Sequence, residues 1–221
     1  MIQRAVSRKR AANILVYHRN TVPIDEQTFR MITRDSAFSY VRVAMNMPMA
    51  PEKLRNFLDS NSENVIVMPI VDAGYAKQLL AQLSKSFPKF RFEVYGMPSW
   101  KGLELLRKEG ALPNVGITIT SPFYFDPTAS AGRGFVETYN RIYGGKPAEL
   151  AYRGYETLYW YASLLNRYGT IFNEHYGDNG AAPFTRFDLR LNKDGDGNPD
   201  YYENNHVYLY RYQAGSFSVE Q

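Results

Sequence analysis

The feature that most constrains this chain is a repeated alternation of short apolar runs and amphipathic segments over roughly its first 120 residues. The apolar runs are rich in β-branched and aromatic residues, as strands are. They cover residues 13–18, 39–45, 64–70, 90–95 and 115–120. Residues 64–70 (NVIVMPI) are apolar at nearly every position, which is typical of a central parallel strand buried on both faces. Five such repeats predict an α/β domain with a doubly wound parallel sheet.

Helical patterns fill the intervals between these strands. Leu79, Leu80 and Leu83 have the spacing of one helix face and predict a helix over residues 76–87. Pro51 is placed to start a helix, because proline is favoured in the first turn. Two further short helices are expected, at residues 25–35 and around 103–106.

The pattern changes after Asp126. Helices are expected over residues 134–143 and 148–168, and strands over 184–191 and 206–212, separated by a loop rich in Asp, Gly and Asn. The longer helix carries a mainly apolar stripe, which we interpret as a packing surface. The stripe consists of Leu150, Gly154, Leu158, Tyr161 and Leu165.

Composition excludes several classes of protein. The net charge is +4, but Arg4, Arg8, Lys9 and Arg10 lie at the N-terminus, and without them basic and acidic residues balance at 22 each. A nucleic-acid partner is therefore not predicted. The absence of cysteine excludes a thiol nucleophile, a cysteine zinc site and disulfides. No apolar run is long enough to span a membrane, and no signal peptide is recognisable in this sequence.

No motif for catalysis or for a bound cofactor is found. Nucleotide-binding glycine loops and the nucleophile-elbow pattern do not occur. The three histidines, His18, His175 and His206, are far apart and lack zinc-binding spacing. We therefore predict a protein that is not an enzyme, with no catalytic residues and no cofactor.

Polar and aromatic side chains follow three of the predicted parallel strands. In a doubly wound sheet, the loops after the strands converge on one edge, where such folds bind ligands. The ligand-binding candidates are His18, Arg19, Asn20, Asp72, Tyr75, Ser99 and Trp100. Two alternatives stay open: His18 as an ordinary polar loop residue, and Trp100 as an aromatic that packs a loop or contacts a neighbouring lobe.

The loop between the last two predicted strands offers a weak calcium candidate. Asp194, Asp196, Asn198 and Asp200 place oxygens at alternate positions, as calcium loops do. Against the EF-hand pattern, Pro199 stands where glycine is required and Asn205 where glutamate is required. A β-hairpin turn is the favoured interpretation, since Asp-Gly and Gly-Asn are strong turn formers, and no metal site is predicted.

The order of these elements resembles the second half of type I periplasmic binding proteins, the branched-chain amino-acid receptor family. The resemblance covers the chain from Ala12 onward and is most specific over residues 135–169. There, the family's pattern of aromatic, glycine and proline positions is matched by Phe135, Tyr139, Tyr143-Gly144, Pro147, Gly154-Tyr155-Glu156 and Gly169.

The resemblance implies a division of the chain. Residues 1–12 would be a basic leader or a cut end, 13–128 a second-lobe-like α/β domain, 129–170 helices that return to the first lobe, and 171–221 a C-terminal β-hairpin segment. It also implies an exported solute-binding module of an ABC transporter, in the periplasm or cell envelope. Its ligand would be small and polar, such as an amino acid, and the family's first lobe is not found here. Among the candidate loops, Asp72 is the acidic residue that could meet an amino group.

A second function is compatible with the same resemblance. Similar modules occur in Bacteroides-type envelope proteins attached to peptidoglycan-binding LysM repeats. There the cleft would be vestigial and the surface would bind a partner. A membrane permease, a peptidoglycan-associated partner and a homodimer are therefore the remaining partner hypotheses.

Overall fold

The computed structural model describes residues 13–34, 39–46, 48–176, 182–213 and 215–220. The chain divides into two compact units: unit 1 holds the residues up to 120 together with those from 209 onward, and unit 2 holds residues 121–208. The expected leader, residues 1–12, lies outside the described residues. Within those residues, no helix has both the length and the apolarity needed to cross a membrane.

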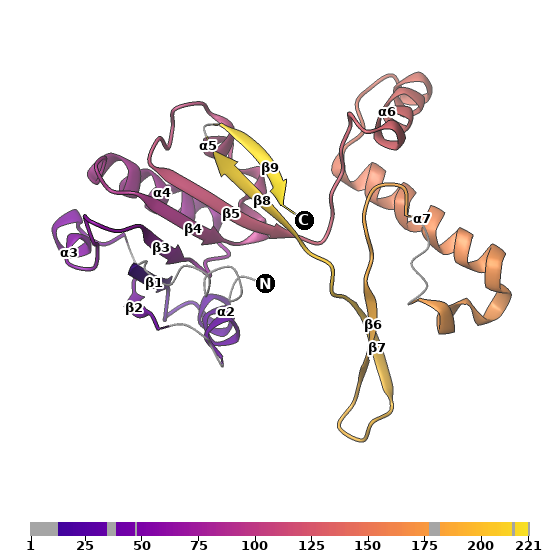
Figure 1. Cartoon of the computed structure of the whole chain (residues 1–221), viewed down its shortest axis with the longest axis horizontal. Coiled ribbons are helices and arrows are strands. Elements are labelled where there is room, and N and C mark those ends of the chain that lie inside the picture. The colour runs from indigo at the N-terminus through magenta and orange to yellow at the C-terminus, as the bar shows by residue number, and fades with distance from the viewer. Residues whose placement is uncertain (1–12, 35–38, 47, 177–181, 214, 221) are drawn as a thin grey trace. The chain divides into compact units, whose positions relative to one another are not determined.

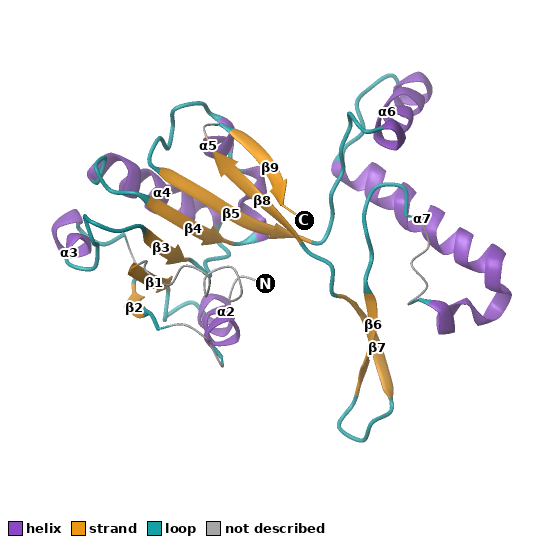
Figure 2. Cartoon of the chain, in the orientation of Figure 1, coloured by secondary structure: helices purple, strands orange, loops and turns teal. Residues whose placement is uncertain are grey.

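Unit 1 is built on a seven-stranded sheet with the order β2-β1-β3-β4-β5-β8-β9 (Figures 1 and 2). The first five strands are parallel, and β8 and β9 form an antiparallel hairpin at the far edge. The strands are β1 (Asn13–His18), β2 (Val41–Ala44), β3 (Asn64–Val67), β4 (Phe92–Gly96), β5 (Val115–Ser121), β8 (Tyr208–Gln213) and β9 (Ser216–Glu220). The predicted doubly wound α/β fold class is confirmed.

The helices of unit 1 lie between the parallel strands. They are α2 (Pro23–Thr33), α3 (Pro51–Arg55), α4 (Ala73–Ser86) and α5 (Glu104–Arg107), with a 3₁₀ helix η1 (Pro98–Gly102). Proline occupies the first turn of α2, α3 and η1, where its missing N–H is not needed. The helix expected at 25–35 thus begins two residues earlier and ends at Thr33; residue 35 lies outside the described residues.

Both faces of the central strands are buried. Every residue of β3 and β4 is buried, as the apolar run at 64–70 predicted. On one face, Phe29 of α2 packs against Val16, Val65, Val67 and Tyr95. Right-handed crossovers place α4 and α5 on the other face, where Leu79, Leu80 and Leu83 are fully buried.

Trp100 is one of the largest side chains in this core. It is fully buried, and its indole Nε1 donates a hydrogen bond of 2.8 Å to the carbonyl oxygen of Ile70. The indole lies against the backbone of Gly96, so closely that a Cβ at residue 96 would stand 2.1 Å from the ring. Glycine at the end of β4 therefore provides the space into which η1 packs.

Unit 2 contains two long helices and a separate hairpin. The helices are α6 (Ser130–Tyr143) and α7 (Glu149–Tyr168), followed by a 3₁₀ helix η2 (Gly169–His175). Antiparallel strands β6 (Leu189–Lys193) and β7 (Pro199–Asn204) form a two-stranded sheet. Phe125 stacks on Tyr152 at 4.2 Å and contacts Phe135 and Phe184, so aromatic rings form the inner contact of this unit.

A buried carboxylate ties the segment after residue 181 to α7. Glu156 accepts hydrogen bonds from the backbone N–H groups of Phe184 and Thr185, and the Thr185 hydroxyl donates to it at 2.7 Å. Both Glu156 and Thr185 are almost fully buried. Because a buried carboxylate needs several donors, this contact selects the face of α7 that packs.

The packing stripe predicted for α7 is wrong. Its buried face is formed by Glu156, Trp160 and Leu164, whereas Leu150 and Leu158 are 77% and 73% exposed. Apolar and aromatic residues of α7 itself occur on more than one face of the helix, so helical periodicity alone did not identify the face that packs. The Glu156 contact and the rings of Tyr176 and Phe187 around Trp160 determine it.

The C-terminal strands form two hairpins instead of one. The segment expected as a strand over 184–191 is extended only from Leu189, and β6 pairs with β7, which lies inside the expected loop. The segment expected at 206–212 becomes β8, which joins the edge of the large sheet beside β5. On one side β8 pairs with β9, its neighbour in sequence, and on the other side it lies beside β5, which is distant in sequence.

We expect Gly96→Ala to destabilise unit 1 by about 3 kcal/mol, because the added methyl group overlaps the Trp100 ring in a closed core. Gly102→Ala is the matched control, since a Cβ at residue 102 meets nothing within 4 Å. Urea unfolding followed by tryptophan fluorescence measures both. Equal midpoints for the two variants would contradict the packing role of Gly96.

Candidate functional site

The candidate site lies at the carboxyl ends of β1 and β3. In the order β2-β1-β3, the chain first moves from β1 to β2 and then returns past β1 to β3. The connections therefore diverge between β1 and β3, and this switch point is where open α/β sheets bind ligands. Arg19 follows β1, and Val71 and Asp72 follow β3 and precede α4.

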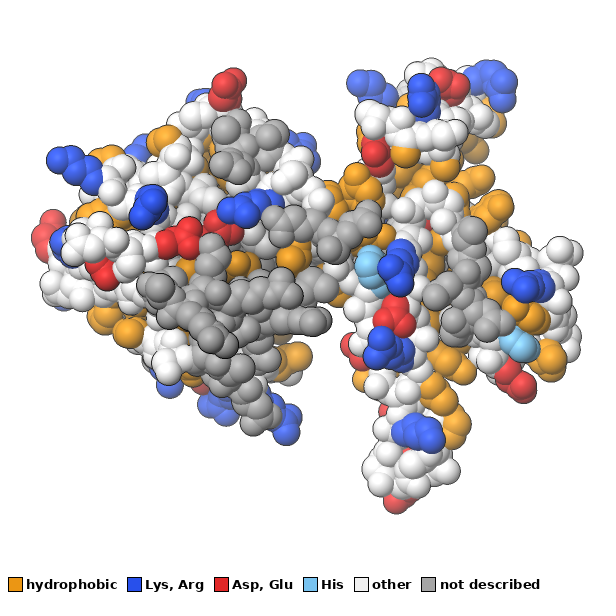
Figure 3. Space-filling view, in the orientation of Figure 1, with side chains coloured by type: hydrophobic (Ala, Val, Ile, Leu, Met, Phe, Trp, Pro, Cys, Tyr) orange, Lys and Arg blue, Asp and Glu red, His pale blue; other side chains and the backbone are white. Residues whose placement is uncertain are grey.

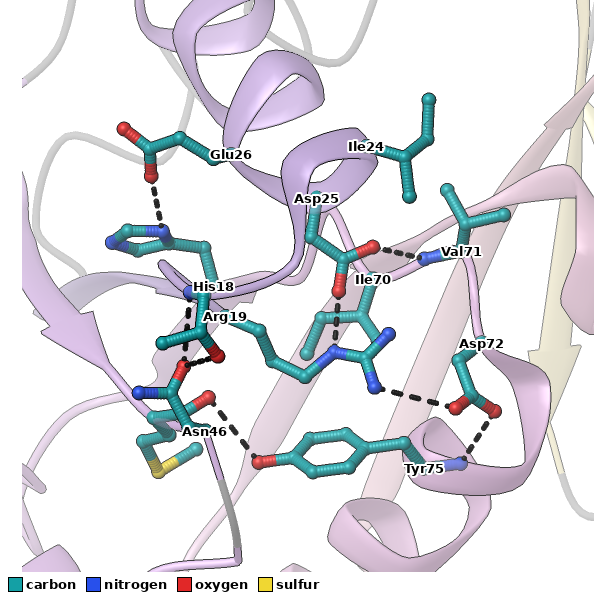
Figure 4. A network of polar contacts seen from close by, with 12 residues as sticks. His18, Arg19, Ile24, Asp25, Glu26, Asn46, Ile70, Val71, Asp72 and Tyr75 are labelled. Atoms are coloured by element: carbon teal, nitrogen blue, oxygen red, sulfur yellow. Dashed lines mark hydrogen bonds and ion pairs between the residues drawn. The ribbon is translucent and has the colours of Figure 1, made fainter.

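Arg19 is the centre of the polar network at this point (Figure 4). Its Nε donates a hydrogen bond of 2.5 Å to Oδ2 of Asp25, and its Nη1 lies 3.3 Å from Oδ2 of Asp72. The other oxygen of Asp25 accepts from the backbone N–H of Val71 at 3.1 Å. Asp25 is fully buried in the first turn of α2, so the network joins β1, α2 and the loop after β3.

Asp72 and Tyr75 form the half-exposed side of this network. The carboxylate of Asp72 caps α4 by accepting from the N–H of Tyr75 at 3.0 Å. That hydrogen bond and Arg19 hold the pKa of Asp72 below its usual range, so the side chain is ionised. The guanidinium of Arg19 lies 4.8 Å from the centre of the Tyr75 ring, and the Tyr75 hydroxyl donates to the carbonyl oxygen of Met45.

His18 is buried at the end of β1 beside this network. Its Nε2 accepts a hydrogen bond of 2.8 Å from Nε of Arg42, and its Nδ1 lies 3.0 Å from Oε2 of Glu26. Because a guanidinium always donates, Nε2 carries no proton and the imidazole is neutral. The ring also stacks on Phe29 at 4.1 Å. Burial and the charge of Arg42 lower the pKa of His18, against the opposing effect of Glu26 and Asp25.

A cavity of about 500 Å³ extends from this network along α2. Its wall is formed by Asn20, Thr21, Pro23, Glu26, Gln27, Arg30, Met31 and Arg34. Asn20 is exposed, and both the N–H and the hydroxyl of Thr21 donate to Asn46. The wall therefore offers an amide and charged side chains, and Arg19, Asp25 and Asp72 are not part of it.

The structure brings most of the predicted site residues to one edge of the sheet. His18, Arg19, Asp72 and Tyr75 lie in or beside the network, and the Ser99 hydroxyl donates to the carbonyl oxygen of Val71 at 2.7 Å. Trp100 is different, because it is buried with its only donor satisfied and packs within the core. That arrangement is the alternative of an aromatic that packs a loop.

Two central members of the network were not among the predicted residues. Asp25 and Glu26 lie in the first turn of α2, and the sequence pattern predicted only a helix there. An acidic pair in the first turn of a helix that directly follows a strand carrying His and Arg is the signal that could have identified them.

The weak calcium candidate, Asp194–Asp200, lies at the turn between β6 and β7, as the favoured interpretation predicted. Asp194 Oδ1 accepts from the backbone N–H groups of Asp196 and Asn198, at 3.0 and 2.8 Å. The hydrogen bond from the N–H group of Asn198 makes the largest contribution to lowering the pKa of Asp194. Across the residues that the structure describes, no three acidic, histidine or cysteine side chains are grouped to hold a metal ion.

Removal of the buried charge at residue 25 should destabilise unit 1 strongly. We expect Asp25→Asn to lower the free energy of unfolding by about 3 kcal/mol, because Arg19, whose side chain is only 11% exposed, then loses its main counter-charge. Asp72→Asn is the control: this side chain is 50% exposed and asparagine can still cap α4, so a loss below about 1 kcal/mol is expected. Urea unfolding of both variants gives the comparison, and similar losses would refute the structural role of Asp25.

Acidification should destabilise unit 1 through His18. Its pKa is lowered in the folded state, so the unfolded chain binds the proton first, and stability present above about pH 6.5 is lost as the pH falls below it. In a Trp160→Phe background, Trp100 alone reports the unfolding of unit 1. Between about pH 7.5 and about pH 5.5, we expect a smaller loss for His18→Gln than for the parent; an equal loss would show that His18 is not responsible.

Comparison with known proteins gives structural relatives only. No protein-family model matches this chain, and no curated protein matches it. Among solved structures, it is similar to an ABC transporter substrate-binding protein from Desulfitobacterium hafniense in complex with Leu, with 16% identity over 99% of this chain and 63% of that chain and a TM-score of 0.61.

Two further structures cover almost the whole chain. One, described as a candidate branched-chain amino acid ABC transporter from Rhodospirillum rubrum, has 16% identity, a TM-score of 0.62 and coverage of 98% of this chain and 62% of that chain. The other, full-length LpoA from Haemophilus influenzae, has 14% identity, a TM-score of 0.53 and coverage of 99% and 38%. The chain thus spans less than two thirds of each matched structure. At these identities the likeness shows the fold alone, which is a lobe of the type I periplasmic-binding-protein kind.

Proposed function

We propose that this chain is part of an extracytoplasmic solute-binding protein that binds a small polar ligand, such as an amino acid. The observation that supports this proposal most directly is the polar network at the β1–β3 switch point. It holds an ionised, half-exposed Asp72 directly after Val71, to whose carbonyl oxygen the Ser99 hydroxyl donates, and Asn20 follows Arg19 as an exposed amide. The substrate-binding proteins among the structural neighbours, one of them in complex with Leu, support this assignment.

The network suits binding because its inner part is fixed before a ligand arrives. Arg19 is held by Asp25 and Asp72, and Asp25 is held by the backbone of Val71. Asp72 is held by the Tyr75 N–H and by Arg19, and the Ser99 hydroxyl by the carbonyl oxygen of Val71. These two side chains therefore have little freedom to lose, which lowers the cost of binding. In this proposal Asp72 accepts from the ligand's amino group, and the Asn20 amide and the Ser99 hydroxyl hydrogen-bond its other polar atoms.

A single lobe provides only one wall of such a site. The outward face of α7 exposes Leu150, Leu158 and Leu165 in a row, and Figure 3 shows hydrophobic side chains at the surface over α6 and α7. We propose that in the intact binding protein this face contacts a first lobe, which would supply the opposite wall. Ligand would then be held by closure of two lobes about hinge strands.

Titration of the chain with a panel of amino acids, followed by amide NMR shifts, tests the proposal. We expect shifts at Asn20, Asp72 and Ser99 and a dissociation constant in the millimolar range, since one wall makes few contacts. Asp72→Asn should abolish them, whereas Asp196→Asn, an exposed change of equal charge in the β6–β7 turn, should not. Shifts confined to other surfaces would contradict the site, and micromolar binding by this chain alone would contradict the need for a second lobe.

A second function is favoured by the exposed face of α7 and by the likeness to LpoA, whose C-terminal domain is described as a regulator of PBP1A. In that case the chain is an interaction module of the cell envelope, peptidoglycan-associated, and the switch-point network is only structural. Amino acids would then cause no shifts at Asn20, Asp72 or Ser99. The apolar face would instead lead to association with a partner, and a strictly monomeric chain by light scattering would count against it.

A further inference from the structure

A second cavity lies at the opposite, amino-terminal edge of the sheet in unit 1. Its volume is about 500 Å³. Arg91 precedes β4, and Val115 and Gly116 begin β5, so this cavity lies at the other end of the strands from the switch point. The lining consists of Arg91, Glu93, Glu109, Gly110, Leu112, Pro113, Asn114, Val115, Gly116, Arg211 and Tyr212.

A buried carboxylate forms one wall of this cavity. Glu93, on β4, is 4% exposed; one of its oxygens accepts from the Thr118 hydroxyl at 3.0 Å and the other from Nη2 of Arg211 at 3.2 Å. The carboxylate reaches over β5 because residue 116 is glycine: a Cβ there would lie 2.6 Å from Oε2 of Glu93. Both oxygens of Glu93 are thus engaged by the chain, and Arg211, whose side chain is 39% exposed, contacts it through one nitrogen.

The remaining polar groups of the lining are mainly donors. Tyr212 is fully buried, and its hydroxyl has no hydrogen-bond partner among the residues described. A buried hydroxyl without a partner is costly and rare in native proteins. Arg91 is exposed at the rim, and Arg211 is 39% exposed although it contacts Glu93. Leu112 and Val115, both buried, supply an apolar floor.

We propose that this cavity binds a small organic monocarboxylate. The ligand's carboxylate accepts from the Tyr212 hydroxyl and from the guanidinium groups of Arg91 and Arg211, and its short apolar part lies on Leu112 and Val115. Glu109, exposed at the rim, disfavours a second negative charge. The site is distinct from the switch point and does not depend on the function proposed there.

An isosteric series tests the charge and the place of the ligand. Butyrate, butyramide and butylammonium have similar shapes but differ in charge, and amide NMR shifts locate each of them. We expect butyrate to shift the amides of Leu112, Gly116 and Tyr212, with weaker shifts from butyramide and none from butylammonium. Stronger shifts with butylammonium, or none with butyrate, would overturn the proposal. Butyrate shifts confined to Asp72 and Tyr75 would also overturn it, since they would place the ligand at the switch point.

Two variants test the donors separately. Tyr212→Phe keeps the buried ring and removes only the hydroxyl, so we expect about tenfold weaker butyrate binding, the effect of one hydrogen bond to a charged group. Arg91→Gln, an exposed change that leaves the core intact, should also weaken it. Tyr201→Phe, at an exposed position of β7, is the control and should change nothing. Unchanged affinity in Tyr212→Phe and Arg91→Gln would refute the assignment of these donors.

Discussion

The central strands of unit 1 exclude water from both faces, so a charged or imidazole side chain that is buried against the sheet is costly unless the chain supplies a partner. Three groups meet this constraint in the same way. Asp25 is paired with Arg19, Glu93 with Arg211, and His18 with the guanidinium of Arg42. The first and third pairs fix the loops at the carboxyl edge of the sheet, and the second joins β8 to β4 across β5.

This constraint also makes the two edges of the sheet differ in chemistry. At the switch point the buried pair Arg19–Asp25 leaves Asp72 half-exposed and ionised, which suits a ligand with an amino group. At the opposite edge both oxygens of Glu93 accept hydrogen bonds from Thr118 and Arg211. The donors that also line this cavity include Arg91 and Tyr212. The same physical requirement thus leaves a half-exposed carboxylate at one edge and the side chains of Arg91, Arg211 and Tyr212 around a cavity at the other.

Local patterns predicted the strands and most helices of unit 1 because apolar runs and helical spacing are properties of neighbouring residues. They also predicted that His18, Arg19, Asp72 and Tyr75 lie at one edge of the sheet, since the loops after parallel strands converge there. They did not identify Asp25, whose partner Val71 is 46 residues away. Trp100 appeared as a loop residue in the sequence, yet the space beside Gly96 draws it into the core.

Apolar runs and helical spacing were enough to predict the order of strands and helices in the first 120 residues and the burial of both faces of the parallel sheet. Counting charges was enough to show that basic and acidic residues balance beyond the first ten. Three features appear only in the folded chain: the buried face of α7, the place of β8 in the large sheet, and the ion pair of Glu93 with Arg211, 118 residues away. The reason is physical: these outcomes depend on partners far away in the chain. Periodicity reports only which residues share a face, not what that face will meet.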